Sequence, residues 1–351
     1  MKKKLIITAI TGFVSLILGL ILAGIGFFSG GIDQLNNVVR PEYKEETYKQ
    51  LDQLTINAGY NRPIRIIQSP DDLYHVRYHD FKNSSLMPLH VNETEGQLTI
   101  DSIVPKFKID GIMQYAAEGV AAHNPDYLEL TIEIPKGKTL KKLDTSVDGL
   151  LIDGVHIQEI ALYGSPSIIN STIDKGSING GYSQIYVEKS ILKNLTVNSY
   201  TSSIHISDSQ LENTRWENYD SMETSNITVI GDNMFTSNTE NSYSIANINL
   251  SEKSQKEALL TAEVVIEKKK LFQFMDSGMT DEEIENLLEN DYHVQEQLKE
   301  IGIFPEDVYK DQKVTGTDDK QSLTVGNKDS KNKLTITATN GTINLGKKWR
   351  P

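Results

Sequence analysis

The feature that most constrains this chain is an internal repeat of constant length. Five positions recur in neighbouring copies: Ile178, Ile185, Val187, Ser190 and Leu192 in one copy correspond to Val197, Ile204, Ile206, Ser209 and Leu211 in the next, all at the same offset. A fixed period, here about 19 residues, is typical of proteins built from stacked units, each of which contacts its two neighbours.

Within each copy the apolar residues alternate at i and i+2 and stop at Gly, Asn, Ser or Asp, a pattern that predicts a strand followed by a turn. A period of this length fits one coil of a parallel β-solenoid, whose strands hydrogen-bond to the next coil about 4.8 Å away. The predicted fold class is therefore mainly β: a single N-terminal transmembrane helix, then a parallel β-solenoid (β-helix-like) with a helical insertion near the C-terminus. The repeat is weakest at residues 214–233, where we expect a bulge or an insertion.

The N-terminal segment has a different composition. Lys2, Lys3 and Lys4 precede an uncharged, mainly apolar run, residues 5–28, which is long enough to cross about 30 Å of hydrocarbon. Lysines before a membrane span favour a cytoplasmic N-terminus, so the rest of the chain is expected outside the cell. A cleaved signal peptide is the alternative, with Ser29-Gly30-Gly31 as its cleavage site, but the run is longer than a typical signal core.

Three small residues, Ser15, Gly19 and Ala23, fall on one face of this helix. They would let a second helix approach closely, which makes a homodimer through the anchor possible. The alternative explanation is that glycine is common in membrane helices.

The composition limits the partners of the outer part. The chain has 48 acidic residues against 35 Lys and Arg, a formal charge of −13, and no cysteine. Nucleic acid is excluded because a phosphate binder needs a clustered basic face, and disulfides are excluded with the cysteines. A basic partner suits the chain better.

The chain outside the repeats divides by pattern. Residues 64–79 predict two strands around a turn at Ser69-Pro70-Asp71-Asp72, whereas residues 105–126 have no period and predict a loop. A helix is expected from Thr280, which forms a T-x-x-E capping box with Glu283, and a second helix between about residues 255 and 274.

The segment LTITATNGTINL, residues 334–345, repeats the strand spacing, so the solenoid is expected to resume there. The predicted parts are 1–31 (cytoplasmic stub and transmembrane anchor), 32–52 (juxtamembrane linker), 53–140 (irregular β region leading into the solenoid), 141–250 (solenoid repeats), 251–320 (helical insertion and linker) and 321–351 (final β coil).

Five features occur together in this chain: the anchor, the strand-rich opening, the LTIEIPKG segment at residues 130–137, the short strand repeats and the final LTITATNGTINL. With this combination the chain resembles the putative-adhesin, β-strand-repeat domain family of unknown function in Gram-positive bacteria. The resemblance covers roughly residues 45–250 and 320–347, and the helical insertion departs from it. It implies an extracytoplasmic β-solenoid of the cell envelope, with adhesion or envelope-stress sensing as its role and no catalytic residue.

No motif for catalysis, for a cofactor or for a metal was found. His75 and His79 are four residues apart on a strand, about 13 Å, which is too far to share a metal, and both are expected at the surface. The acidic groups, Asp71-Asp72 among them, lack the spacing of a calcium loop. We therefore predict a protein that is not an enzyme. The alternative is a solenoid polysaccharide hydrolase or lyase, with Glu217 and Glu240 as the acids of a hydrolase on adjacent coils.

Tyrosines mark the coils: Tyr163, Tyr182, Tyr200 and Tyr219 follow one another at nearly the period of the repeat. If their rings point outward, they form a ligand-binding aromatic strip that can stack on sugar rings of the cell wall. If they point inward, they form a ladder that stabilises the stack. The sequence thus predicts a non-catalytic, membrane-anchored module that binds or senses, with cell-wall glycan or an envelope protein as partner.

Overall fold

The computed structural model describes residues 2–26, 29, 40–58, 62–81, 88–103, 112–180, 184–199, 203–237, 243–267 and 280–346. The chain forms two compact units. The first unit comprises residues 1–44, 78–89 and 102–129, and the second comprises residues 45–77, 90–101 and 130–351.

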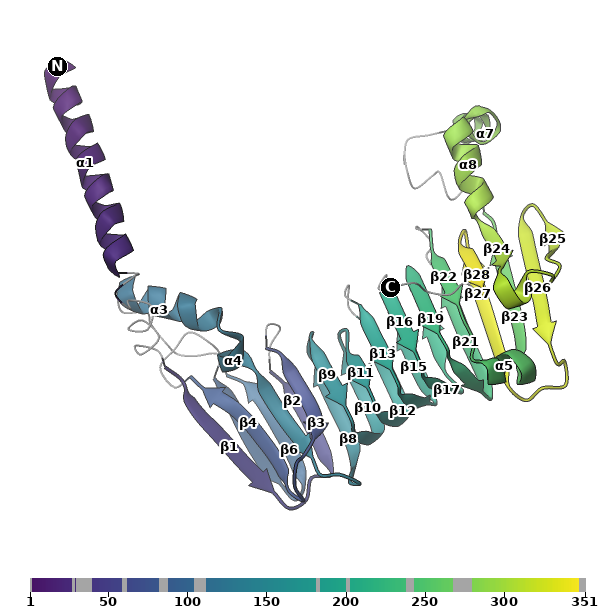
Figure 1. Ribbon diagram of the computed structural model, residues 1–351, viewed down its shortest axis with the longest axis horizontal. Helices are drawn as coiled ribbons and strands as arrows, with labels where there is room; N and C mark the ends of the chain where they lie inside the picture. The colour runs from purple at the N-terminus through teal and green to yellow at the C-terminus, as the bar shows by residue number, and fades with distance from the viewer. Residues whose placement is uncertain are drawn as a thin grey trace. The chain divides into compact units, whose positions relative to one another are not determined.

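Most of the strands lie in two long sheets (Figure 1). The first sheet has the order β1 (Glu42–Tyr48), β4 (Tyr74–Asp80), β7 (Leu130–Ile134), β3 (Ile64–Gln68), β9 (Leu150–Asp153), β11 (Ser167–Ile169), β13 (Ile185–Glu188), β16 (Ser203–Ser207), β19 (Ser221–Ser225), β22 (Ile245–Ile248), β28 (Thr342–Leu345) and β24 (Gly302–Pro305). The second sheet has the order β25 (Thr315–Thr317), β26 (Lys320–Gly326), β23 (Leu259–Val265), β27 (Lys333–Thr339), β21 (Asp232–Ser237), β18 (Arg215–Glu217), β15 (Leu195–Asn198), β12 (Thr172–Asn179), β10 (His156–Tyr163), β8 (Thr139–Ser146), β2 (Gln53–Asn57), β6 (Gln97–Ser102) and β5 (Leu89–Thr94). Beside it, β14 (Ile191–Lys193), β17 (Gln210–Glu212) and β20 (Thr228–Ile230) form a short third row.

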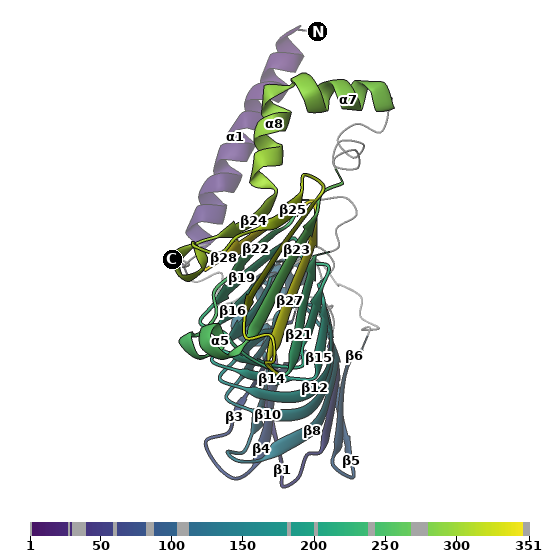
Figure 2. The ribbon, with the colours of Figure 1, turned by 90° about the vertical axis from the view of Figure 1, so that its right-hand side faces the viewer.

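The repeat positions pair in register from coil to coil. Ile185 pairs with Ile204, and Leu192 pairs with Leu211, all in parallel strands. Figure 2 shows the strands of successive coils stacked on one another. The four side chains are buried, because each coil covers the apolar surface of its neighbour. The predicted parallel β-solenoid is therefore confirmed.

The coil corners explain which polar residues repeat. One corner per coil has a positive φ, at Asn170, Lys189, Asp208 and Asn226, a conformation that Asn and Asp tolerate better than most residues. At the first three of these corners the next residue is a buried serine: the backbone N–H of Ser171 donates to Oγ of Ser190 in the next coil, at 3.1 Å. The corner serines thus satisfy backbone donors in the interior.

The coil at residues 214–233 is irregular, as predicted. Ser203 pairs with Ser221 at a sequence separation of 18, whereas Arg215 pairs with Met234 at the usual separation of 19. One residue is therefore missing before Ser221, and one is added near Gly231, which has a φ of +65°. A Cβ at Gly231 would lie 2.1 Å from Oδ1 of Asn213, so any other residue would have to displace that side chain.

The solenoid resumes near the C-terminus, as predicted. Strand β27 pairs in parallel with β21, and β28 pairs with β22. Leu334, Ile336, Ile343 and Leu345 are all buried, so this segment completes the apolar interior. Helices α7 (Asp281–Asn290) and α8 (Tyr292–Glu300) precede β24, and α7 begins with the predicted capping box of Thr280 and Glu283.

Three local predictions were wrong. The expected loop at 105–126 contains helix α3 (Ile112–Ala122) and the start of α4 (Pro125–Leu128), because an alanine-rich segment favours helix even without clean amphipathic spacing. In the described part of the helix expected at 255–274, residues 255–267, the helical residues are those of α5 (Glu252–Glu257). Residues 259–265 form β23, whose buried Leu260, Ala262 and Val264 have the period of a strand.

The third error concerns the linkers. Strand β1 lies inside the expected juxtamembrane linker, and β25 and β26 form an antiparallel pair in the expected C-terminal linker and beyond it. β1 is an edge strand that carries mostly charged residues. Its sequence therefore lacks the alternation of apolar and polar residues that predicts a strand.

Helix α1 (Lys2–Gly26) belongs to the first unit. In the part of the chain that the structure describes, it is the one helix long and apolar enough to cross a membrane, over Ile6–Gly26, and none of that span is buried in the protein. The hydroxyls of Thr8 and Thr11 donate to the carbonyls of Lys4 and Ile7, which removes their polarity from the helix surface.

Candidate functional site

The two described members of the predicted tyrosine strip, Tyr163 and Tyr219, lie at connections from the second sheet to the first. Tyr163, the last residue of β10, is 63% exposed, whereas Tyr219 is completely buried. Tyr182 and Tyr200 lie outside the described residues. Tyr219 therefore cannot belong to an exposed strip; it packs inward at the shortened connection, and burial raises the pKa of its phenol.

A hollow of about 180 Å³ lies beside Tyr163. Its lining combines Tyr163 with Asp148, Asn179 and backbone at Gly164 and Gly180. A Cβ at Gly164 would lie 2.2 Å from the carbonyl oxygen of Val147, so the close approach of successive coils requires glycine at this position.

The peptide at Tyr163 is held firmly. The backbone N–H of Val147 donates to the carbonyl of Tyr163 at 3.0 Å, and the N–H of Gly164 donates to the carbonyl of Asn179 at 2.9 Å. The sheet hydrogen bonds therefore continue past the strand ends, and they fix the direction in which the Tyr163 side chain leaves the surface.

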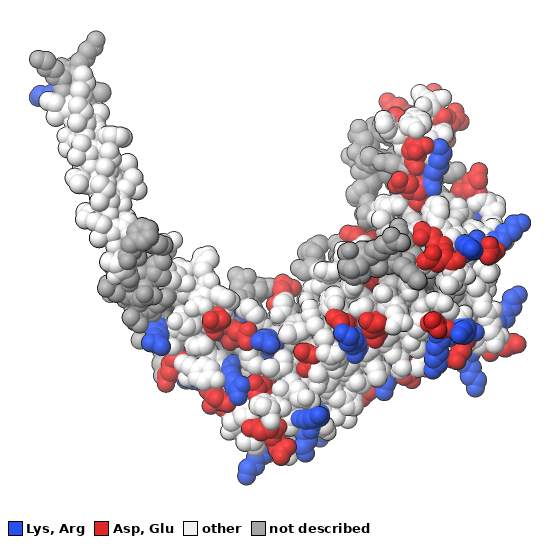
Figure 3. All heavy atoms as spheres, in the orientation of Figure 1, with Lys and Arg blue, Asp and Glu red and all other residues white. Residues whose placement is uncertain are grey.

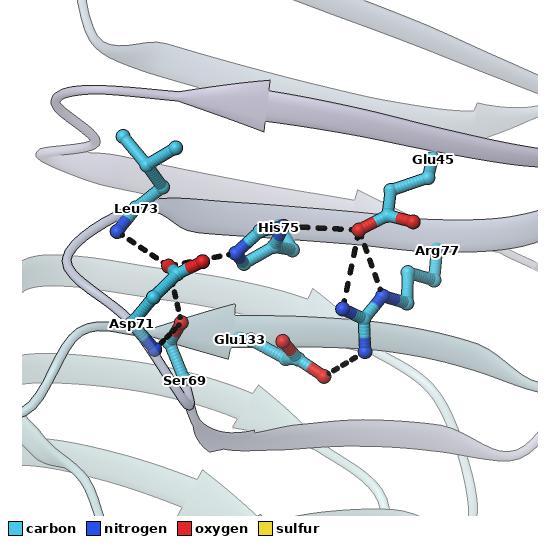
Figure 4. Close-up of polar contacts among 7 residues, drawn as sticks. All are labelled: Glu45, Ser69, Asp71, Leu73, His75, Arg77 and Glu133. Atoms are coloured by element: carbon cyan, nitrogen blue, oxygen red, sulfur yellow. Dashed lines mark hydrogen bonds and ion pairs between the residues drawn. The ribbon is translucent and has the colours of Figure 1, made fainter.

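A second polar group, the His75 cluster (Glu45, Asp71, His75, Arg77 and Glu133), lies on β1, β4, β7 and the turn before β4 (Figure 4). Both ring nitrogens of His75 meet carboxylates, Nδ1 at 3.1 Å from Glu45 and Nε2 at 2.9 Å from Asp71. Arg77 donates to Glu45 at 3.1 Å and to Glu133 at 2.5 Å.

The structure corrects the expectation that His75 is a surface residue, since it is only 6% exposed. The pKa of Asp71 lies below its ordinary value. The largest cause is its hydrogen bond to His75, and the second largest is the hydrogen bond from the backbone N–H of Leu73. A neutral imidazole has a single N–H, so only the charged ring donates to both carboxylates. The cluster therefore ties the edge strand β1 and the turn at Asp71 to β4.

Glu133 is the buried acid of this cluster. It is 4% exposed, and its Oε1 accepts from Arg77, while Oε2 has no hydrogen-bond partner among the described residues. A buried carboxylate in this position depends on its arginine. The cluster is thus a structural ion-pair network.

Other candidates from the sequence do not come together as a site. Glu217 lies at the end of β18, but its suggested partner, Glu240, lies outside the described residues. No group of three His, Asp or Glu in the described ranges is arranged to hold a metal ion.

Acidic side chains gather on α7 and α8 (Figure 3), and Asp318 lies by a hollow of about 480 Å³ beside α8. Ser15, Gly19 and Ala23 are exposed on α1, so their role in helix packing stays a prediction.

Parallel strands stacked coil upon coil define this chain as a β-solenoid protein. It belongs to the family described as Toastrack DUF4097, whose model matches residues 51–346. The resemblance to a β-strand-repeat family of unknown function is thereby confirmed, while the Gram-positive source stays a prediction.

Comparison with curated proteins finds no match. Among solved structures, a putative cell adhesion protein from Clostridium sporogenes is similar over 87% of this chain and 99% of its own, with 11% identity and a TM-score of 0.23. A putative adhesin from Bacteroides fragilis is similar over 87% of this chain and 97% of its own, with 13% identity and a TM-score of 0.30.

Proposed function

We propose that this protein is a membrane-anchored, extracytoplasmic binding module of the cell envelope, without catalysis of its own. The observation that carries the proposal is helix α1: a mainly apolar span of 21 residues, none of it buried in the protein, attached to a Toastrack solenoid. Such a helix needs a bilayer around it, and the preceding lysines favour export of the solenoid.

The binding role rests on the surface rather than on a reaction centre. The solenoid presents a long polar face with an exposed tyrosine beside a hollow, and the described part of that hollow contains one acid, Asp148. A glycosidase needs two acids placed on either side of the scissile bond. The adhesin-like role that the family resemblance implies fits this surface.

Topology is the first test. The chain has no cysteine, so Lys4→Cys and Asp329→Cys each introduce a single thiol, the latter in an exposed turn. A membrane-impermeant maleimide should label Asp329→Cys in intact cells and Lys4→Cys only after lysis. Labelling of Lys4→Cys alone in intact cells would contradict the proposed orientation.

Cleavage and binding are tested separately. The mass of the mature protein from membranes should include residues 1–31, whereas a cleaved signal peptide would remove them and release the protein into the medium. The full-length protein in detergent should sediment with isolated bacterial cell walls, and it should release no reducing or unsaturated sugar ends from them. A failure to sediment would overturn the binding role.

A further inference from the structure

The exposed ring of Tyr163 belongs to a continuous row of outward side chains. The strand pairing places one residue of each coil directly beside the corresponding residue of the next coil. We call this row the polar column; its members are Ser146, Tyr163, Asn179, Asn198, Glu217, Thr236 and Thr337. The residue before each member is buried, including Leu162, Ile178 and Trp216. Because side chains alternate across a strand, the column points away from the interior.

The column runs along the solenoid axis with a step of about 4.8 Å, the distance between neighbouring strands. Tyr163 is its single aromatic member and is 63% exposed, with Ser146 one coil before it and Asn179 one coil after it. Two side-chain hydrogen bonds are made along the described column: Asn198 accepts from Asn218 at 3.0 Å, and Thr337 donates to Thr236 at 3.2 Å. The amides of the column therefore keep hydrogen-bonding capacity for a ligand.

We propose that Tyr163, with Asp148 and Asn179, forms the central subsite for a neutral, extended glycan that lies along the polar column. This inference rests on the binding role proposed above and names its ligand class. One pyranose ring stacks on the face of Tyr163 and enters the hollow, and the next rings contact Asn179 and Asn198.

The chemistry of the subsite selects this ligand. A tyrosine ring presents a flat apolar face to the C–H groups of a sugar ring, while a carboxylate and an amide beside it accept and donate hydrogen bonds to hydroxyls. The hollow of about 180 Å³ has room for one ring. An extended glycan advances by nearly one coil spacing per sugar, so its hydroxyls meet a polar side chain at each step.

Charge disfavours an acidic glycan at the hollow beside Tyr163. Asp148 stands in the hollow, Glu217 lies three coils after Tyr163, and no column member is basic. The lysines of β8 and β12 on this sheet are paired, since Lys175 lies 2.8 Å from Glu159 and Lys142 lies 3.8 Å from Asp144. Farther along the column, the exposed Arg215 lies two residues before Glu217 on β18 and hydrogen-bonds to Met234. A uronic-acid polymer would bring its carboxylates against these acids without a free cation in the described column.

The test measures sedimentation of the full-length protein in detergent with chitin, cellulose, polygalacturonate and peptide-stripped cell-wall glycan. The wild type should bind chitin or cellulose, the two neutral β-linked polymers, more tightly than polygalacturonate or the wall glycan, whose carboxylates are exposed once the peptides are removed. Tyr163→Ala should weaken this binding about tenfold, the loss of one aromatic contact, while Tyr163→Phe should keep it within about twofold. Tyr163→Leu retains apolar bulk without a flat ring and should behave like Tyr163→Ala.

Tyr292→Ala is the matched control, since Tyr292 on α8 is 71% exposed and lies outside the column; its affinity should equal that of the wild type. Melting temperatures show whether a variant is folded. Equal binding by Tyr163→Ala and the wild type, retained binding by Tyr163→Leu, or preference for polygalacturonate would overturn the subsite and leave the binding role intact. Absence of binding to walls and to every polymer would instead overturn the binding role itself.

Discussion

The backbone N–H of Ser171 donates to the hydroxyl oxygen of Ser190, one coil further along the chain and in the buried interior. The Ser190 hydroxyl in turn donates to the carbonyl of Glu188 at 2.8 Å. One small side chain thus satisfies a donor of the previous coil and an acceptor of its own.

Ser190→Ala should lower the free energy of unfolding by about 1 to 3 kcal/mol, because the N–H of Ser171 loses its acceptor in a place that water does not reach. Urea denaturation of the full-length protein in detergent measures the loss. Ser221→Ala is the control: its hydroxyl donates to Ser203 on the exposed face, and a change within about 0.5 kcal/mol is expected. Equal effects of the two variants would contradict the interpretation.

Tyr219→Phe should raise the free energy of unfolding by about 1 kcal/mol, because removing a buried, unpaired polar group removes its desolvation cost while the ring continues to fill the interior. The phenol of Tyr219 is completely buried, and its hydroxyl has no partner among the described residues. Chemical denaturation tests this, and a clear destabilisation would show that the hydroxyl is bonded in solution.

Arg77→Met should lower the free energy of unfolding by about 3 kcal/mol, because it leaves the buried carboxylate of Glu133 without its cation. Arg77→Met with Glu133→Gln should recover a large part of this loss, since the buried carboxylate of Glu133 is then replaced by a neutral amide. The control is Lys142→Met, whose partner Asp144 is exposed and 3.8 Å away, with an expected change below about 0.5 kcal/mol. The same loss in the single and double variants would contradict the role of the charge.

Asp71→Asn should reduce the acid sensitivity of the fold. The folded pKa of Asp71 lies below its ordinary value of 3.8, chiefly through the hydrogen bond from His75. A lowered carboxyl pKa contributes stability that is fully present above the unfolded pKa and is lost as the pH falls through the folded pKa. The difference in stability between wild type and variant should therefore be largest above about pH 5 and should disappear only after the pH has fallen through the folded pKa of Asp71, which lies below 3.8.

Denaturation curves at successive pH values measure that difference. In a His75→Asn background the same substitution should have a smaller effect, because the largest cause of the lowered pKa is then absent. An unchanged difference at all pH values would show that Asp71 titrates alike in the folded and unfolded chain.

Much of the fold was predictable because its interactions repeat. The local alternation of apolar and polar residues predicts that Val187 and Val197 are buried. Asn170 and Asp208 predict corners, because Asn and Asp tolerate a positive φ. The site was less predictable. The spacing of Tyr163 and Tyr219 is regular, yet one is exposed and the other buried, because the connection at Tyr219 is one residue shorter.

The sequence by itself determined the apolar helix at the N-terminus, the strand period, the coil length and the return of the solenoid at residues 334–345. Each of these features depends on the types of residues that are close together in the chain. Only the tertiary structure decided that His75 is buried between Glu45 and Asp71 and that β23 joins the sheet. Those outcomes depend on groups far apart in the chain, which meet only when the coils stack.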